Sequence, residues 1–239
     1  MNVGDNSPRR LDLGAIEQTA ETLSLRVHDR FPDRGIDGIA CELVTVSHET
    51  RLRLERLAKP RWILRASLGT LVVIGVASVV AIVLVANLRF HVDGLPDWLD
   101  LFQNAIQDLV YLGIAGLFLA GAERRAQRRD ILAGLHELRS VAHVIDMHQL
   151  TKDPRSTTHP EDRVPHSPDR PDDPQSLFHY LDYCSEMLSI CNKLAALYAQ
   201  ESQDPVVLST VSDIQDLTTS LSSKIWQKIM ILSDVASTH

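Results

Sequence analysis

The sequence predicts an all-α membrane protein with two transmembrane helices and a cytosolic antiparallel helical bundle. Three observations support this fold class. The stretch from Ala66 to Leu88 is apolar and uncharged throughout, and arginine-rich segments flank the apolar part of the chain on both sides. Elsewhere, apolar residues recur every three or four positions, which is the period of an α-helix that buries one face. The sequence contains no alternating strand pattern longer than a few residues.

The first 60 residues predict a cytosolic amphipathic hairpin of two helices. Asp12 is suited to cap the first helix, and Pro32 and Gly35 are expected to end it. The second helix should then run from about Asp37 to Pro60. A hairpin of about 45 residues is too small for a stable core of its own. It therefore needs a partner, which the sequence leaves open as the C-terminal domain, another subunit or the membrane surface.

The stretch from Ala66 to Leu88 predicts the first transmembrane helix. Its 23 residues carry no charge and lie between Arg65 and Arg89. With a rise of about 1.5 Å per residue, such a helix covers the hydrocarbon core of a bilayer, which is about 30 Å thick. A buried helix of a soluble protein is the alternative, but few such helices are apolar on every side over this length. The small residues that would let another helix approach closely are Gly75, Ala77, Ser78 and Ala81.

The second transmembrane helix is more weakly marked. Leu109 to Ala122 is free of charge but has only 14 residues, fewer than a span needs. Extended back to Trp98, the segment reaches 25 residues, which places Trp98 at the outer interface, where aromatic residues are common. Gly94 and Pro96 are expected to break the chain before this helix. The small residues in its inner half, suited to helix packing, are Gly113, Gly116, Ala120 and Gly121.

Polar side chains form one stripe along the second span. Asp97, Asp100, Asn104, Asp108 and Tyr111 follow one another at intervals of three or four residues, so they share a helix face. In an oligomer, Asp100, Asn104 and Asp108 would line the pore of a small cation channel. Alternatively, the stripe lies in the outer interface in contact with water. We favour the second interpretation because several of these residues lie within about two turns of the outer end of the span.

The distribution of basic residues predicts the side of the membrane that each segment occupies. The loop between the spans has Arg89 alone, beside three aspartates, whereas both flanking segments are rich in basic residues. Such residues are retained on the cytoplasmic side, so both termini are expected in the cytoplasm. The flanking basic residues are Arg51, Arg53, Arg56, Lys59, Arg61 and Arg65 before the first span, and Arg124, Arg125, Arg128 and Arg129 after the second.

Beyond the second span, the chain is expected to continue as one helix as far as Leu150, because residues 123–150 contain no proline. Residues 151–175 hold six of the eleven prolines and almost no apolar side chain, which predicts a disordered linker. Further helices are expected over 176–200 and after Asp204, which is suited to be an N-cap. The three helices have matching apolar faces and predict an antiparallel bundle.

The predicted organisation therefore has five parts. A cytosolic N-terminal amphipathic helical hairpin (1–60) precedes the transmembrane helical hairpin (61–122). The second span then extends into the cytosol (123–150), and a disordered, proline-rich linker follows (151–175). A C-terminal cytosolic helical hairpin (176–239) completes the bundle.

Two clusters of ionisable residues on the cytosolic helices are the candidate metal or ligand site. His143 and Asp146 lie three residues apart on one helix, and the next helix carries a similar cluster made of His179, Asp182, Tyr183 and Glu186. If these helices pack antiparallel, the clusters would meet and could hold a divalent metal ion. The alternative is a network of interhelical salt bridges and hydrogen bonds that sets the helix register. We favour the network, because each helix offers only one close chelating pair, and we expect no cofactor.

Composition and motifs argue against several functional classes. The formal net charge of −7 argues against a nucleic-acid-binding protein. Cys184 and Cys191 would lie about 10 Å apart on one helix, too far for a disulfide, and we expect them to be small buried apolar residues, like many free cysteines. The third cysteine, Cys41, completes no metal-binding spacing. Because nucleophile-elbow, phosphate-loop and spaced metal motifs are absent from the sequence, we expect no enzymatic activity.

Four stretches of the chain resemble segments of proteins in a single family. They are HELRSVAHVIDMHQLTKDP at 136–154, YLDYCSEMLSICNKLAALYAQ at 180–200, DPVVL at 204–208 and SSKIWQKIMIL at 222–232. Taken together, they are similar to a family of bacterial two-pass inner-membrane proteins, over most of the chain after its arginine-rich segment. The resemblance implies a bacterial cytoplasmic (inner) membrane location. It implies no activity, ligand or catalytic residue.

These features favour a structural role. We expect an oligomeric membrane anchor or scaffold that presents a cytosolic helical bundle to a protein partner. Two alternatives remain: a small oligomeric cation channel lined by the second span, and a metal- or ligand-binding sensor that uses the histidine clusters. The expected partners are the lipid bilayer, further copies of the chain and a cytosolic protein, whereas nucleic acid is not an expected partner.

Overall fold

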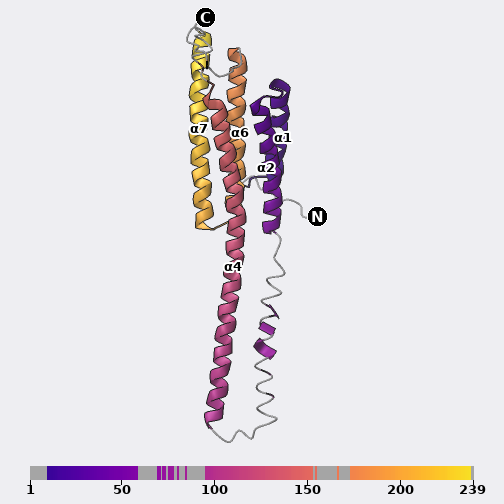
Figure 1. Ribbon diagram of the computed structural model, residues 1–239, viewed down its shortest axis with the longest axis vertical. Helices are drawn as coiled ribbons and strands as arrows, with labels where there is room; N and C mark the ends of the chain where they lie inside the picture. Colours follow the sequence, from indigo (N-terminus) through magenta and orange to yellow (C-terminus); the bar gives the residue numbers. More distant parts are fainter. Residues whose placement is uncertain are drawn as a thin grey trace. The chain divides into compact units, whose positions relative to one another are not determined.

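The described part of the chain is mostly helical and contains no strand, so the predicted all-α class is confirmed. The computed structural model describes residues 10–58, 95–152, 154, 166 and 173–237, together with scattered positions between 69 and 84. Its helices, shown in Figure 1, are α1 (Leu13–Arg30), α2 (Gly35–Ala58), α4 (Leu95–Leu150), α6 (Pro174–Glu201) and α7 (Pro205–Ser237).

The chain divides into two compact units. The first contains α1, α2, α6, α7 and the part of α4 that begins at Asp130, and the second contains residues 58–129. In the first unit, the N-terminal hairpin shares one hydrophobic core with the C-terminal helices. This packing supplies the apolar partner that such a small hairpin requires.

Contacts between helices fix their directions in the first unit, which is a helical bundle (Figure 1). α2 runs antiparallel to α4, because Arg53 pairs with Glu137 near one end while Gly35 lies against His148 near the other. α6 and α7 follow each other through a short connection and pack along their lengths. α1 runs antiparallel to α6, as shown by the ion pairs Arg10–Glu201 and Arg26–Glu186.

The helix α6 lies at the centre of the bundle. Thirteen of its 28 residues are buried, and it contacts helices on several sides. It packs against α1 and α7, and the Tyr198 hydroxyl lies 3.4 Å from the Thr50 hydroxyl of α2. Tyr198 also lies against Gly134 of α4. Because burying a large apolar side chain contributes about 1.5–3 kcal/mol, α6 organises the core of this unit.

Aspartate caps define three helix starts. Asp12, Asp173 and Asp204 each accept a hydrogen bond from a backbone N–H in the first turn that follows. Such side chains satisfy N–H groups that have no partner within the helix. The start of α7 after Asp204 is as predicted, and the predicted cap at Asp12 is confirmed. α6 begins at Pro174, two residues before the predicted boundary, because proline is tolerated at the first helical position.

Two expected breakers lie inside helices instead. α4 begins at Leu95, because Pro96 fits a first turn, where its missing N–H leaves no helical bond unmade. Gly35 is the first residue of α2, and a Cβ at this position would collide with the imidazole of His148. Glycine here therefore permits the close approach of α2 and α4. The turn before it contains Asp33 with a φ of 59°, a left-handed conformation that aspartate tolerates.

The second unit contains the N-terminal part of α4 and the described positions between 69 and 84. Most of the predicted first span, Ala66–Leu88, lies outside the described residues, as does most of the predicted linker at 151–175. Where it is described, the first span is helical. Gly75 is buried there, and a Cβ on it would overlap with the side chain of Leu112. Gly75 thus has the packing role predicted for it, whereas a Cβ on Gly113 would meet no described atom within 4 Å.

The three cysteines provide a test of the bundle core. Cys184 and Cys191 are buried, as predicted, and burial raises the pKa of each thiol to about 12. Cys41 is exposed. Because thiolates are the reactive form, we expect a maleimide reagent to modify one cysteine in the native protein and all three after denaturation. Mass spectrometry of the labelled peptides checks this, and rapid native labelling at Cys184 or Cys191 would contradict the bundle core described here.

Candidate functional site

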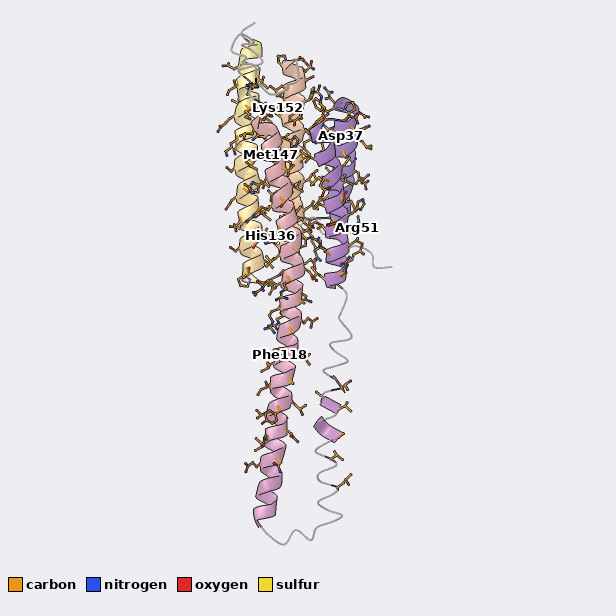
Figure 2. All side chains as sticks on the ribbon, viewed as in Figure 1. Asp37, Arg51, Phe118, His136, Met147 and Lys152 are labelled. Carbon is orange, nitrogen blue, oxygen red and sulfur yellow. The ribbon has the colours of Figure 1, made fainter. Side chains whose placement is uncertain are left out.

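Apolar side chains are exposed over the second unit. On α4, the side chains of Leu109, Leu117 and Phe118 are 71%, 77% and 68% exposed, and Figure 2 shows Phe118 projecting from the helix. Val73, in the other described segment of this unit, is 66% exposed. Among the described residues, one helical stretch, within Ile106–Leu150, is long and apolar enough to cross a membrane, and its most apolar window has no buried residue.

The polar stripe predicted to line a pore lies on the same helix. Asn104 is exposed and Asp108 is half-buried, whereas the side chain of Asp100 lies outside the described residues. The Gln107 side-chain amide donates a hydrogen bond of 3.1 Å to the Tyr111 hydroxyl, so part of the stripe is satisfied within the helix. A pore lining by Asp100, Asn104 and Asp108 stays a prediction.

The histidine clusters have separate surroundings in the bundle. His143 is exposed on α4, and Asp146 accepts a hydrogen bond of 2.7 Å from the side chain of Gln149. The Gln149 side chain in turn accepts a hydrogen bond of 2.8 Å from Lys228 Nζ of α7. The hydrogen bonds around Asp146 therefore join α4 to α7. His179 lies beside the rings of its own helix, those of Phe178 and Tyr183. In the described part of the chain, the four predicted residues form no group close enough to share a metal ion.

Glu186, the fourth predicted residue, connects α6 to α1. Both of its carboxylate oxygens accept hydrogen bonds from the Arg26 guanidinium, at 2.8 and 3.1 Å. This carboxylate raises the pKa of Arg26. Arg26 also lies over the Tyr183 ring, 5.1 Å from its centre. The contact is an interhelical salt bridge of the kind expected for a register-setting network, with Arg26 rather than a histidine as partner.

A third ionisable cluster, which was not predicted from the sequence, joins α1 and α2. Glu17 is buried and contacts both Arg51 and His48, and His48 Nε2 lies 3.6 Å from Glu21. Glu17, Glu21 and His48 are close enough to hold a metal ion. The guanidinium of Arg51 already compensates the buried carboxylate, however, and would repel a second cation. The arrangement therefore acts as an ion network, and only the spacing of the two glutamates could have indicated it.

A second network lies where α2 meets α4. Arg53 donates a hydrogen bond of 2.6 Å to one oxygen of Glu137, and it lies 3.3 Å from Glu49. The Glu137 carboxylate raises the pKa of Arg53. The other Glu137 oxygen is buried and has no hydrogen-bond partner among the described residues. An acceptor in this state is costly and normally has a partner.

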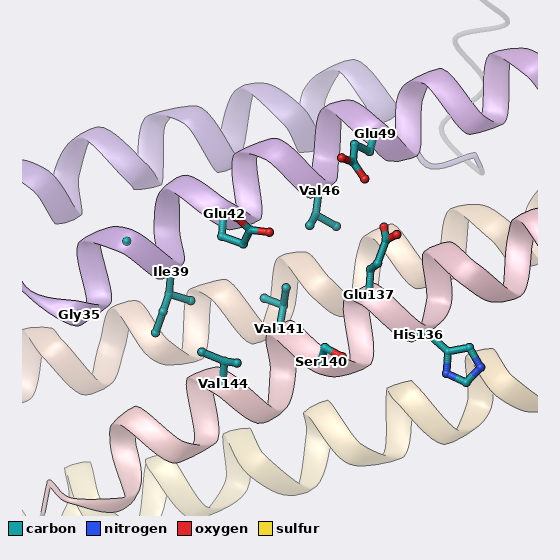
Figure 3. Close-up of a pocket in the computed structure, with 11 residues that line it drawn as sticks. Gly35, Ile39, Glu42, Val46, Glu49, His136, Glu137, Ser140, Val141 and Val144 are labelled. Carbon is teal, nitrogen blue, oxygen red and sulfur yellow. The ribbon is translucent and has the colours of Figure 1, made fainter.

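Next to this network, α2 and α4 enclose a groove of about 660 Å³. Figure 3 shows Val46 of α2 and Val141 of α4 pointing toward each other across it, with the carboxylates of Glu49 and Glu137 at one end. The opposite end is formed by small and apolar residues, which include Gly38. A pocket of this size, with apolar walls and a few charged groups, has the usual make-up of a binding site.

Comparisons with protein-family models, with curated proteins and with solved structures found no match to this chain. The similarity to bacterial two-pass inner-membrane proteins therefore stays a prediction from the four sequence stretches quoted above.

Proposed function

We propose that the chain is an integral membrane protein with two transmembrane helices, Ala66–Leu88 and approximately Trp98–Ala122. In this proposal the helical bundle lies in the cytosol, where the protein serves as an anchor or scaffold for a protein partner. A bacterial cytoplasmic membrane is the proposed location. The observation that carries the proposal is the exposure of apolar side chains over the second unit.

Along α4, leucines that are fully buried in the first unit contrast with leucines that are largely exposed in the second. This difference supports water as the surroundings of the first unit and lipid as those of the second. Leu135 and Leu138 of the bundle are 0% exposed, whereas Leu109 and Leu117, earlier on the same helix, are 71% and 77% exposed. Leaving such a side chain in water forfeits about 1.5–3 kcal/mol relative to burial. A row of them on one helix is unfavourable in water and favourable in the hydrocarbon of a bilayer.

The end of the apolar stretch supports the proposed boundary. Arg124 and Arg125 follow it, and the Arg125 guanidinium lies 5.7 Å from the centre of the Phe118 ring. Basic residues are frequent directly beyond the cytoplasmic end of a span. They also support the proposed orientation, since basic residues are retained on the cytoplasmic side. On α4, the exposed Leu109 and Leu117 precede this point, and the buried Leu135 and Leu138 follow it.

Substitution of two leucines with similar exposure tests the proposal. Leu109 and Leu25 are 71% and 67% exposed, but only Leu109 lies in a proposed span. Arginine near the centre of a span costs about 2.5–3.5 kcal/mol on the insertion scale, which is enough to keep a weak span out of the bilayer. In a bacterial host, green fluorescent protein fused to the C-terminus fluoresces only in the cytosol. We expect fluorescence from the unsubstituted fusion and from Leu25→Arg, and its loss in Leu109→Arg.

Alkaline carbonate extraction of the same membranes supplies the second readout. The unsubstituted chain should remain in the membrane pellet. Release of the chain by carbonate, together with equal fluorescence of the Leu109→Arg and Leu25→Arg fusions, would show that α4 is a water-exposed helix and would overturn the proposal.

A further inference from the structure

The groove between α2 and α4 follows a helical stripe of α2 in which the carboxylates are exposed and Ile39 and Val46 form a buried floor. Its α2 wall is formed by residues at intervals of four, three, four and three positions. This is the spacing with which one helix packs against another in a coiled coil. The stripe extends over about 21 Å at the helical rise, or about four turns. Its residues are Gly35, Ile39, Glu42, Val46 and Glu49.

The α4 wall, like the α2 wall, has apolar residues toward one end and a glutamate at the other. Val144 and Val141 lie toward the apolar end of the groove, and Glu137 lies at its acidic end, each one turn from the next. Ser140 and Gly38 are small, and a Cβ on Gly38 would meet no described atom within 4 Å. The groove is therefore open beside Gly38, at its apolar end, where a side chain of another helix can enter.

The charge of the groove is negative. Glu42, Glu49 and Glu137 line it, and Arg53 is the basic residue that pairs with two of these three. Glu42 has neither an ion pair nor a hydrogen bond through its side chain within the described part of the chain. One oxygen of Glu137 is buried and accepts no hydrogen bond there. An incoming ammonium or guanidinium group would provide both carboxylates with a partner.

From this geometry we propose that the groove binds a cationic amphipathic helix of a partner protein. The apolar face of that helix contacts Val144, which is 39% exposed, above the buried Val46 and Val141, and its lysine or arginine side chains reach Glu42 and Glu137. Helix-in-groove binding of this kind uses apolar anchors at helical spacing, while the charges select a basic partner and exclude acidic ones. The inference rests on the proposed function, because it names the surface through which a cytosolic bundle would hold its partner.

The test uses the full chain in nanodiscs of zwitterionic lipid. The probe is a fluorescein-labelled synthetic peptide of about three heptads, with leucine at the core positions and lysine beside them. Fluorescence anisotropy measures binding, and empty nanodiscs give the background. We expect saturable binding that weakens as salt is raised, and no binding of a peptide in which glutamate replaces every lysine.

Three variants locate the binding. Glu42→Lys reverses a groove charge and Gly38→Leu fills the open apolar end, so each should weaken the affinity by about tenfold, as loss of a charge contact or an anchor does at other interfaces. Glu55→Lys makes the same charge change on α2 outside the groove and should leave the affinity unchanged. Because Glu42 and Glu55 are exposed and Gly38 has free space, none of these changes should unfold the bundle.

The outcomes separate this inference from the membrane proposal. Equal affinity of the unsubstituted chain, Glu42→Lys and Gly38→Leu would overturn the groove assignment, as would absence of binding. A drop in particle mass with Glu42→Lys or Gly38→Leu, measured by mass photometry, would show that a second copy fills the groove and would also overturn it. If carbonate releases the chain while binding persists in buffer without nanodiscs, only the membrane proposal fails.

Discussion

Replacing Leu138 with alanine is expected to lower the free energy of unfolding of the bundle by about 2–5 kcal/mol. Leu138 is 0% exposed and lies in the core of the first unit, so truncation removes buried apolar contacts and leaves a cavity. Leu150, on the same helix, is 69% exposed. Leu150→Ala is therefore the matched control and should change the stability by at most about 0.5 kcal/mol.

The buried cysteines report this stability without interference from the proposed membrane spans. Cys184 and Cys191 both lie in α6, so they react with a thiol reagent only when the bundle opens. When reclosing is fast, the labelling rate follows the population of the open state, and each 1.4 kcal/mol of lost stability raises it about tenfold. Equal labelling rates in Leu138→Ala and Leu150→Ala would contradict the core described here.

Gly134→Ala should also destabilise the bundle, although alanine normally favours a helix over glycine by about 1 kcal/mol. A Cβ at Gly134 would lie 2.7 Å from Nη1 of Arg53 and 2.9 Å from Cζ of Tyr198. Tyr198 is 0% exposed, so it cannot move away without repacking the core. Overpacking of this kind costs about 1–3 kcal/mol.

Gly38→Ala provides the opposite case, since its Cβ would meet no described atom within 4 Å. We expect this substitution to leave the stability unchanged or to raise it by about 0.4–1 kcal/mol. The same cysteine-labelling assay compares the two glycines. Equal stability of Gly134→Ala and Gly38→Ala would contradict the close contact between Gly134 of α4 and Tyr198 of α6.

Local sequence signals predicted the helices well, because those signals act within a few residues. The aspartate caps and the apolar period placed α7 correctly and α6 to within two residues. The helix starts were misplaced at a proline and a glycine that were expected to interrupt helices but are compatible with a first turn. Pro96 is compatible with a first turn, and Gly35 serves a contact with His148 that only the packed bundle contains.

The ionisable clusters were harder to predict, because they depend on which helix faces which. Glu186 was expected to meet the cluster of His143 and Asp146 on α4, whereas in the structure it pairs with Arg26 of α1. The cluster of Glu17, His48 and Arg51 requires the register of the N-terminal hairpin. The groove depends on the separation between α2 and α4. The spacing of residues along one helix shows which of them share a face, but it does not show which side chains of another helix pack against that face.

The central claim is that the chain crosses a membrane twice with its bundle in the cytosol, and cysteine labelling of spheroplasts tests it most directly. The unsubstituted protein, in which Cys41 is the exposed cysteine, should react with a membrane-impermeant maleimide only after lysis. Gly94→Cys places a thiol in the proposed external loop and should be labelled on intact spheroplasts. Ser156→Cys, in the proposed cytosolic linker, should add no labelling until lysis. Labelling of Ser156→Cys but not Gly94→Cys on intact spheroplasts would contradict the proposed orientation, and protection of neither position in a carbonate-soluble chain would contradict the membrane location itself.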